Sequence, residues 1–286
     1  MKKVLVTVLA SLMAYGLVSA QDPTDKKVSA YFLGSDEASF SCTDGAVSGF
    51  WASWDGKDYI DLTVDKNGWN RDGSPFTGSD DARMVVKVAY GANGLYFLYE
   101  VTDNNFVESN DYNSDVADIM LDNLSSADIA AGLSFEMYVQ PSWWTVTYTC
   151  KQFQVPFGGA SLPTTFGYNY YDPSAYTFTS NPTVSIESAP ALYGGLCFDN
   201  IRISDTQKSQ EWFVPWSEVG VDGVPGVPET GAMFGFTGGY NDMDGDDATA
   251  VNALRWIDRT DPWQAPCEST AEVTGKCDAW GDIEIR

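Results

Sequence analysis

The chain has 286 residues, with 40 acidic and 16 basic side chains and no histidine, so its formal net charge is −24. Such an acidic surface repels phosphate backbones and anionic headgroups, so nucleic acid and lipid headgroups are poor partners, whereas neutral sugars and divalent cations are compatible with it. Without histidine, neither a Ser-His-Asp triad nor a thiol–imidazole pair can be built.

The first 20 residues, MKKVLVTVLASLMAYGLVSA, combine two lysines, an apolar run and a small-residue ending. This is the pattern of a cleaved secretory signal, so we predict that residues 1–20 are removed and that the protein is secreted, to the periplasm, the cell surface or the medium. Beyond them we find no run of roughly 20 consecutive apolar residues, the length of a membrane span, and therefore expect no membrane insertion.

Short segments rich in β-branched and aromatic residues, bounded by Gly, Asn, Asp or Pro, predict β-strands along the rest of the chain. The clearest are 82–90, 94–101, 134–140, 144–150 and 231–237. Residues 91–94 (GANG) predict a hairpin turn, and 204–210 and 220–231 predict loops. No window has a sustained helical period. We therefore expect an all-β fold, an antiparallel, jelly-roll-like β-sandwich with long loops, as a single domain over residues 27–286.

Residues 112–122 (YNSDVADIMLD) predict a strand with two different faces. Successive strand side chains point in opposite directions, so Ala117, Ile119 and Leu121 share one face, which we expect in the core. Asp118 lies on the other face, next to Val116. A carboxylate in the middle of this apolar strand is the first candidate for a functional residue.

Five cysteines fit an oxidising compartment but cannot all pair. Cys267 and Cys277 would close a short loop and are the first predicted disulfide, and Cys150 with Cys197 is the second. Cys42 is then left over. The spacings do not match CxxC zinc sites.

Four blocks of the sequence carry a resemblance to a known family. They are residues 85–103 (VVKVAYGANGLYFLYEVTD), the acidic positions Asp115, Asp118 and Asp122, residues 211–216 (EWFVPW), and Asn241-Asp242-Met243-Asp244 followed by Leu254-Arg255-Trp256 and Trp280-Gly281-Asp282-Ile283. In this order they resemble the hairpin, the D-x-x-E motif, the E-x-x-I/V-P-W segment and the ending of the family 9 carbohydrate-binding modules. These modules are β-sandwiches related in fold to the DOMON domains, which bind sugars or haem. Asp118 stands where the family has Glu.

The resemblance implies a sugar site. In the family a pyranose is held between two aromatic rings, and the matching positions are Tyr112 and Trp263. The acidic residue of the D-x-x-E motif accepts hydrogen bonds from sugar hydroxyls, which points to Asp118. Asn241 and Asp258 complete the predicted sugar contacts. The implied partner is a neutral oligo- or polysaccharide, such as the end of a plant polysaccharide chain, but the sugar itself is not specified.

The run 241–247 (NDMDGDD) raises the question of calcium, which six to eight oxygen ligands bind. Counting from Asp242, Gly245 is fourth and Ala253 twelfth, whereas an EF-hand needs Gly at six and Glu at twelve. Structural calcium is known in the family 9 carbohydrate-binding modules, which this sequence resembles. The alternatives are a solvated acidic turn and a calcium site with Asp242, Asp244 and Asp246 as ligands.

The leading hypothesis is a non-catalytic carbohydrate-binding protein. A β-sandwich glycoside hydrolase would need two carboxylates about 5 to 10 Å apart, and no E-x-D-x-x-E or similar paired-acid motif is present. A haem protein of the DOMON type usually ligates iron with Met and His, so the absence of histidine argues against haem. A surface or adhesion protein that reuses the sandwich, alone or in a complex, stays open because fold does not imply function.

Overall fold

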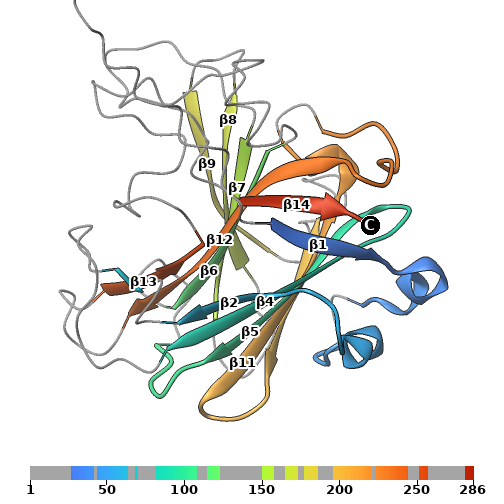
Figure 1. Cartoon of the computed structure of the whole chain (residues 1–286). Coiled ribbons are helices and arrows are strands. Elements are labelled where there is room, and N and C mark those ends of the chain that lie inside the picture. Colours follow the sequence, from blue (N-terminus) through green and yellow to red (C-terminus); the bar gives the residue numbers. More distant parts are fainter. Residues whose placement is uncertain are drawn as a thin grey trace, which may run out of the picture.

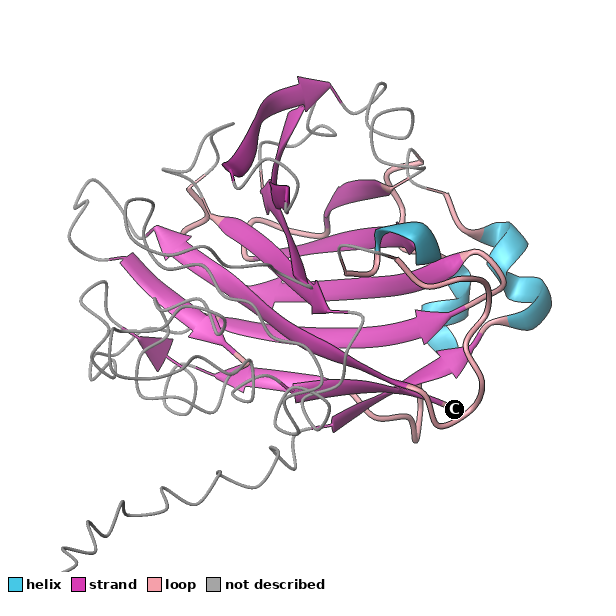
Figure 2. Ribbon diagram, turned by 90° about the horizontal axis from the view of Figure 1, so that it is seen from above, coloured by secondary structure: helices cyan, strands magenta, loops and turns pink. Residues whose placement is uncertain are grey.

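A computed structural model of the chain describes residues 27–41, 44–63, 68–69, 82–107, 115–122, 150–157, 165–172, 177–185, 196–220, 223–243, 251–256 and 281–286. Within these residues the strands form a single curled sheet, and the helical segments are short 3₁₀ turns (Figure 1). Seen from above, the strands lie in layers and the helical turns gather at one side (Figure 2). The predicted all-β sandwich is confirmed.

One half of the sheet, which we call sheet A, runs from β1 (Lys27–Phe32) to β9 in the order β1-β14-β12-β6-β7-β8-β9, with β13 beside the last part of β12 and β3 beside β13. The strands of sheet A are β14 (Gly281–Ile285), β12 (Met233–Met243), β6 (Val116–Asp122), β7 (Cys150–Pro156), β8 (Thr165–Asp172), β9 (Thr177–Ser185), β13 (Val251–Arg255) and β3 (Gly68–Trp69). All these strand pairs are antiparallel except β1 with β14.

The other half, sheet B, has the order β10-β11-β5-β4-β1, with β2 as a second neighbour of β4. Its strands are β10 (Cys197–Arg202), β11 (Gln207–Pro215), β5 (Gly94–Thr102), β4 (Arg83–Tyr90) and β2 (Ile60–Thr63). Strand β1 (Lys27–Phe32) joins the halves, because Lys27–Ala30 pair with β14 and Tyr31–Phe32 pair with β4. Both contacts are parallel, so the predicted purely antiparallel sheet is in fact mixed.

The main core lies between the two halves and follows the strand alternation. Sheet A contributes Ala117, Ile119 and Leu121 from β6, as predicted, and all three are fully buried. Sheet B contributes every second residue of β5 and the indole of Trp212 on β11. Apolar surface removed from water by such side chains stabilises a fold by about 25 cal/mol per Å².

The outer face of sheet B is covered by the N-terminal segment that contains η1 (Gly34–Ser39) and η2 (Gly49–Ser53). Phe50, Trp51 and Trp54 pack there against Tyr96 and Leu98, so β5 is buried on both faces. A near-continuous apolar sequence is typical of strands covered on both sides. The run GLYFLYEV on β5 therefore indicates a central strand and not an exposed hairpin arm.

Several sequence predictions can be compared with these elements. Strands β4, β5 and β12 confirm the predicted strands near 82–90, 94–101 and 231–237, and the turn between β4 and β5 closes through Gly91 N–H to the Gly94 carbonyl at 3.0 Å. The predicted loop 204–210 is wrong at its end, because β11 begins at Gln207 and pairs with β10 and β5 on either side. The polar sequence QKSQ is typical of a loop and therefore did not predict this strand, although Lys208, Ser209 and Gln210 are buried. Residues 134–140 and 144–149 lie outside the described residues.

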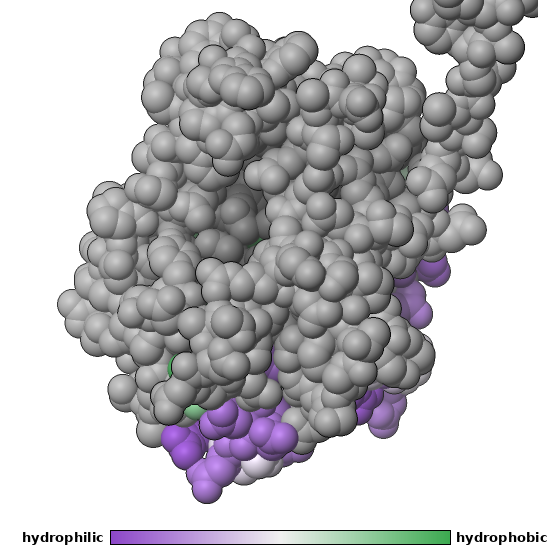
Figure 3. All heavy atoms as spheres, turned by 90° about the vertical axis from the view of Figure 1, so that its left-hand side faces the viewer, coloured by the Kyte–Doolittle hydropathy of each residue, from purple (hydrophilic) through white to green (hydrophobic). Residues whose placement is uncertain are grey.

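Large exposed hydrophobic side chains are scattered over the described surface: Phe32, Tyr59, Ile203 and Val227. On the face shown in Figure 3, most of the described residues visible at the lower edge are hydrophilic. No helix within the described ranges is long and apolar enough to cross a membrane.

Candidate functional site

Two of the predicted sugar contacts lie on neighbouring strands of sheet A. Asp118 on β6 pairs with Gly239 of β12 on one side and with Gln154 of β7 on the other. Asn241, two residues after Gly239, pairs with Val116. Directly opposed residues of an antiparallel pair share a face, and every second residue returns to it, so positions 118, 239 and 241 share one face.

This shared face is the one turned away from the core. Ala117 and Ile119 on β6 and Tyr240 on β12 are core residues, so strand alternation assigns their neighbours to the opposite side. Gly239 pairs with position 118 and precedes position 241 by two residues; it carries no side chain, and it is itself buried. The register thus brings positions 118, 239 and 241 together from two segments more than a hundred residues apart in the sequence.

The remaining predicted site residues cannot be placed. Tyr112, Asp258 and Trp263 lie outside the described residues, as do the two predicted calcium ligands Asp244 and Asp246. Both predicted disulfides include cysteines whose side chains are not described, so these pairs stay predictions.

Asp242 has a different environment from the solvated turn that its sequence allows. It lies on the core side of β12 and is fully buried. Asp103, just after β5, and Asp115, just before β6, are buried beside it, and one carboxylate oxygen from each residue lies within 4.8 Å of the others. Sheet A and sheet B therefore both contribute aspartates to this cluster, which we call the aspartate triad.

Backbone and side-chain donors fix the triad. Asp103 accepts hydrogen bonds from the Asn105 N–H at 2.8 Å and from the Tyr240 hydroxyl, and Asp115 accepts one from the Val107 N–H at 2.7 Å. Burial and the neighbouring carboxylates raise the pKa of Tyr240 well above its usual value, so its hydroxyl stays protonated and donates. Asp115 also anchors the chain on both sides, because its N–H reaches the Val107 carbonyl and its carbonyl accepts from Phe157.

The triad has the chemistry of a hard-cation site. Three ionised carboxylates this close, away from water, repel one another and lose their hydration, so they require protons or a compensating positive charge. Ca²⁺ takes six to eight oxygen ligands, and three carboxylates with no nitrogen or sulfur among them match that preference. Asp103, Asp115 and Asp242 could thus supply half or fewer of the ligands of one calcium ion.

Sequence reasoning missed two members of the triad. Asp103 ends the first resembling block, Asp115 opens the second, and Asp242 belongs to the fourth. The acid-rich run 241–247 drew attention to residues that are close in sequence, whereas the observed cluster joins residues up to 139 positions apart. The shared signal was an aspartate at or near one end of three of the four blocks.

A second buried acidic pair lies on the outer face of sheet B. Asp199 on β10 and Glu211 on β11 are directly opposed, and both are fully buried under the N-terminal segment. Burial raises the pKa of Glu211 to about 7 and that of Asp199 to about 6, although Ser48 and Gly45 donate hydrogen bonds to them. These values would suit a general acid. A substrate cannot reach either carboxyl group, however, while the segment covers them.

The chain was also compared with known proteins. No protein-family model matches the sequence, and no curated protein matches it. Among solved structures, a family 9 carbohydrate-binding module from Caldicellulosiruptor kristjanssonii in complex with glucose is similar, with 15% identity over 91% of this chain and 96% of that chain and a TM-score of 0.48. A module of this family from the same organism in complex with cellotriose is 14% identical over 91% of this chain and 94% of that chain, with a TM-score of 0.49. A protein from Bacteroides uniformis that was proposed to bind carbohydrate is 12% identical over 91% of this chain and 99% of that chain, with a TM-score of 0.48.

Proposed function

We propose that the protein is a secreted, non-catalytic carbohydrate-binding protein that holds a neutral sugar on the outer face of sheet A. Tyr112 and Trp263 would form the aromatic walls, and Asp118, Asn241 and Asp258 would accept or donate hydrogen bonds at the rim. The observation that carries the proposal is the register of β6 and β12, which makes positions 118 and 241 neighbours on one face.

The chemistry of a sugar explains why these residue types belong together. A pyranose presents C–H faces to aromatic rings and a rim of hydroxyls to polar groups. Stacking both faces would remove on the order of 100 to 150 Å² of apolar surface from water, or roughly 3 kcal/mol. A hydrogen bond to a charged group adds about 1.5 to 3 kcal/mol before ordering costs, so the expected dissociation constant is roughly millimolar to micromolar.

Calcium is a second part of the proposal. Asp103, Asp115 and Asp242 would hold the ion, and Asp244 and Asp246, which follow in sequence, stay predicted ligands. The ion would neutralise the triad and tie the end of β5 to the start of β6 and the end of β12. It would thereby stiffen the part of sheet A that carries positions 118 and 241, without itself touching the sugar.

Isothermal titration with cello- and xylo-oligosaccharides, with and without calcium, tests the proposal. Trp263→Ala should abolish binding and Asp118→Asn, which keeps the shape but removes the charged acceptor, should weaken it at least ten-fold. Tyr59→Ala, which removes an exposed aromatic ring elsewhere, is the matched control and should bind like the wild type. No binding to any soluble sugar or plant polysaccharide would refute the function, and release of reducing sugar from β-glucans would favour a hydrolase.

The calcium part has its own readout. If the triad binds calcium, the ion stabilises the folded state by about 2.7 kcal/mol at a concentration 100 times the dissociation constant. The melting temperature should therefore rise with calcium in the wild type and not in Asp103→Asn. An unchanged melting temperature in calcium and in chelator would show that the triad is neutralised from within, by protons or by a cationic group of the protein.

A further inference from the structure

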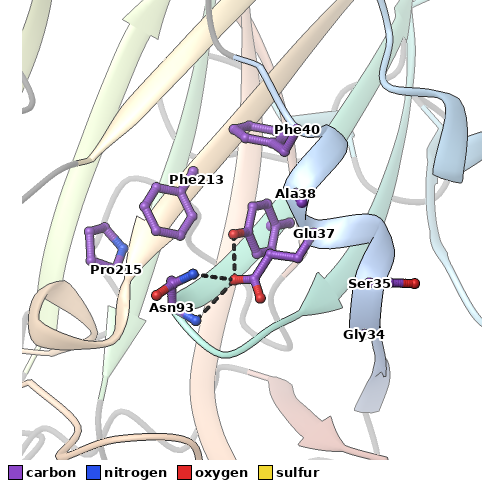
Figure 4. A pocket seen from close by; sticks show the side chains of 9 residues that line it. Gly34, Ser35, Glu37, Ala38, Phe40, Asn93, Phe213 and Pro215 are labelled. Carbon is purple, nitrogen blue, oxygen red and sulfur yellow. Dashed lines mark hydrogen bonds between the residues drawn. The ribbon is translucent and has the colours of Figure 1, made fainter.

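A groove lies on the outer face of sheet B, on the other half of the sheet from Asp118 and Asn241. It is bounded by η1, the turn between β4 and β5, and the end of β11, and it opens to solvent with a volume of about 600 Å³ (Figure 4). Small-molecule sites typically have volumes of about 300 to 1,000 Å³. The groove is therefore large enough for a small ligand.

Aromatic rings form one side of the groove. The ring of Tyr96 lies 4.9 Å from that of Phe40 and 5.0 Å from that of Phe213, centroid to centroid. Tyr96 is buried, whereas Phe40 and Phe213 are only partly buried, and Pro215 continues the apolar wall beside Phe213 (Figure 4). Flat apolar rings that remain partly exposed at a groove provide a stacking surface.

The polar side of the groove is organised by Glu37. Its Oε1 accepts hydrogen bonds from the Asn93 N–H and from Asn93 Nδ2, both at 3.0 Å, and from the Tyr96 hydroxyl at 2.8 Å. Its Oε2 accepts one from the Ala92 N–H at 2.8 Å. Glu37 thus has a structural role, because it holds the β4–β5 turn and fixes the orientation of the Asn93 amide.

The side-chain amide of Asn93 is available for hydrogen bonds to a ligand. One hydrogen of its Nδ2 is used by Glu37, which leaves the second hydrogen and the Oδ1 lone pairs, and no donor among the described residues reaches Oδ1. Figure 4 shows the amide oxygen turned away from Glu37, toward the side of Pro215. An exposed amide with one donor and one acceptor, held in place by a carboxylate, matches the donor and acceptor of sugar hydroxyls at little ordering cost.

The charges at the groove disfavour anions. The described lining includes no Lys or Arg, and the chain carries a net charge of −24. The one carboxylate in the lining, Glu37, keeps its charge, but four donors of the protein already surround its oxygens, so few lone pairs are left for hydrogen bonds from a ligand ammonium group. A neutral polyhydroxylated ring satisfies both the aromatic wall and the amide.

We infer that this groove is a second saccharide-binding subsite, with Phe40 and Phe213 as the stacking surface and Asn93 as the hydrogen-bonding group. It would bind on a different half of the sheet from the site proposed above. A protein with two such surfaces could contact two chains of a polysaccharide, or two points of one chain, and gain avidity from weak individual sites.

Titration of ¹⁵N-labelled protein with cellotriose and xylotriose, followed by nuclear magnetic resonance, tests the inference. We expect amide shifts at residues 37–40, 93–96 and 213–215 in addition to those near 118 and 241. The shifts at the groove should persist in Trp263→Ala, which removes only the site on sheet A. The two proposals can therefore fail separately.

Two variants and one control make the test specific. Asn93→Ala, at an exposed position, and Phe213→Leu, which keeps apolar bulk but removes the flat ring, should each weaken binding at the groove at least ten-fold. Tyr59→Ala should leave it unchanged. The inference is overturned if no shifts occur at the groove, if they are unchanged in both variants, or if tetramethylammonium shifts these amides and the sugars do not. Should Phe213→Leu not fold, Asn93→Ala alone decides.

Discussion

Glu37 and Glu211 hold the same N-terminal segment on the outer face of sheet B, but their environments give them opposite electrostatic character. Burial alone would raise the pKa of Glu37, yet hydrogen bonds from Tyr96, Asn93 and Ala92 outweigh it and lower the pKa. Glu211 is fully buried, accepts hydrogen bonds from Ser48, and lies opposite Asp199, and its pKa rises to about 7.

The difference shows that burial and hydrogen bonding decide what an acidic residue does to stability. Glu37 stabilises the fold as a carboxylate, because four donors are arranged around its charge. Glu211 stabilises the fold more as a neutral acid than as a carboxylate, because it and the opposed Asp199 are shielded from water. Four experiments test this contrast between the two glutamates.

The largest effect should come from truncating Trp51, a residue of the N-terminal segment that covers Glu211. Trp51 is 2% exposed and its ring lies 4.7 Å from that of Phe50 and 4.9 Å from that of Trp54. Trp51→Ala should lower the free energy of unfolding by about 3 to 5 kcal/mol, the range for large-to-small core substitutions. It should also let water reach Glu211, so the pH dependence described next should shrink. Trp51→Phe is the control; if it weakens the pH dependence as much as Ala does, shielding by the ring is not the cause.

The next effect is the pH dependence that Glu211 imposes. Its folded pKa of about 7 lies above the ordinary 4.5, so its contribution to stability is fully present below about pH 4.5 and is lost as pH rises through 7. The loss should be on the order of 3 kcal/mol, with Asp199 adding to it below pH 6. Glu211→Gln should flatten the curve of unfolding free energy from pH 4.5 to 8, measured in urea. Exposed Glu229→Gln should not change it, and a curve that stays steep in Glu211→Gln would contradict the assignment.

Glu37 should show the opposite sign. Its lowered folded pKa means that its contribution is present above about pH 4.5 and is lost as pH falls further. Glu37→Gln removes the charge that four donors face, and should cost about 1 to 2 kcal/mol at pH 7. The cost should shrink as the pH falls below 4.5 and the wild-type side chain itself takes up a proton. A cost that does not change with pH would mean that Glu37 acts by shape alone.

The sequence predicted the sheet better than it predicted these carboxylates. The alternation of Ala117, Ile119 and Leu121 and the GANG turn are local signals, and both are confirmed. Glu211 and Asp199 are acidic residues in strand-like segments, and nothing local says that Ser48 lies over them. The aspartate triad was hidden for the same reason, since strands from both halves of the sheet bring it together. Register and cover depend on long-range packing, which a single sequence does not reveal.

The smallest effect is expected for an exposed ion pair, that of Arg83 with Asp61. Arg83 on β4 donates to both oxygens of Asp61 on β2, at 2.7 and 2.9 Å, but the side chains are 50% and 39% exposed. Water solvates both charges, so a double-mutant cycle with Arg83→Met and Asp61→Asn should give a coupling of only about 0.5 kcal/mol, even though the geometry is bidentate. In 1 M salt, where the Debye length is about 3 Å, the coupling should shrink further, whereas that between Glu37 and its buried partner Tyr96 should persist. If the exposed pair proved as strong and as insensitive to salt as the Glu37–Tyr96 pair, donor geometry and not exclusion of water would govern the strength of these carboxylate contacts.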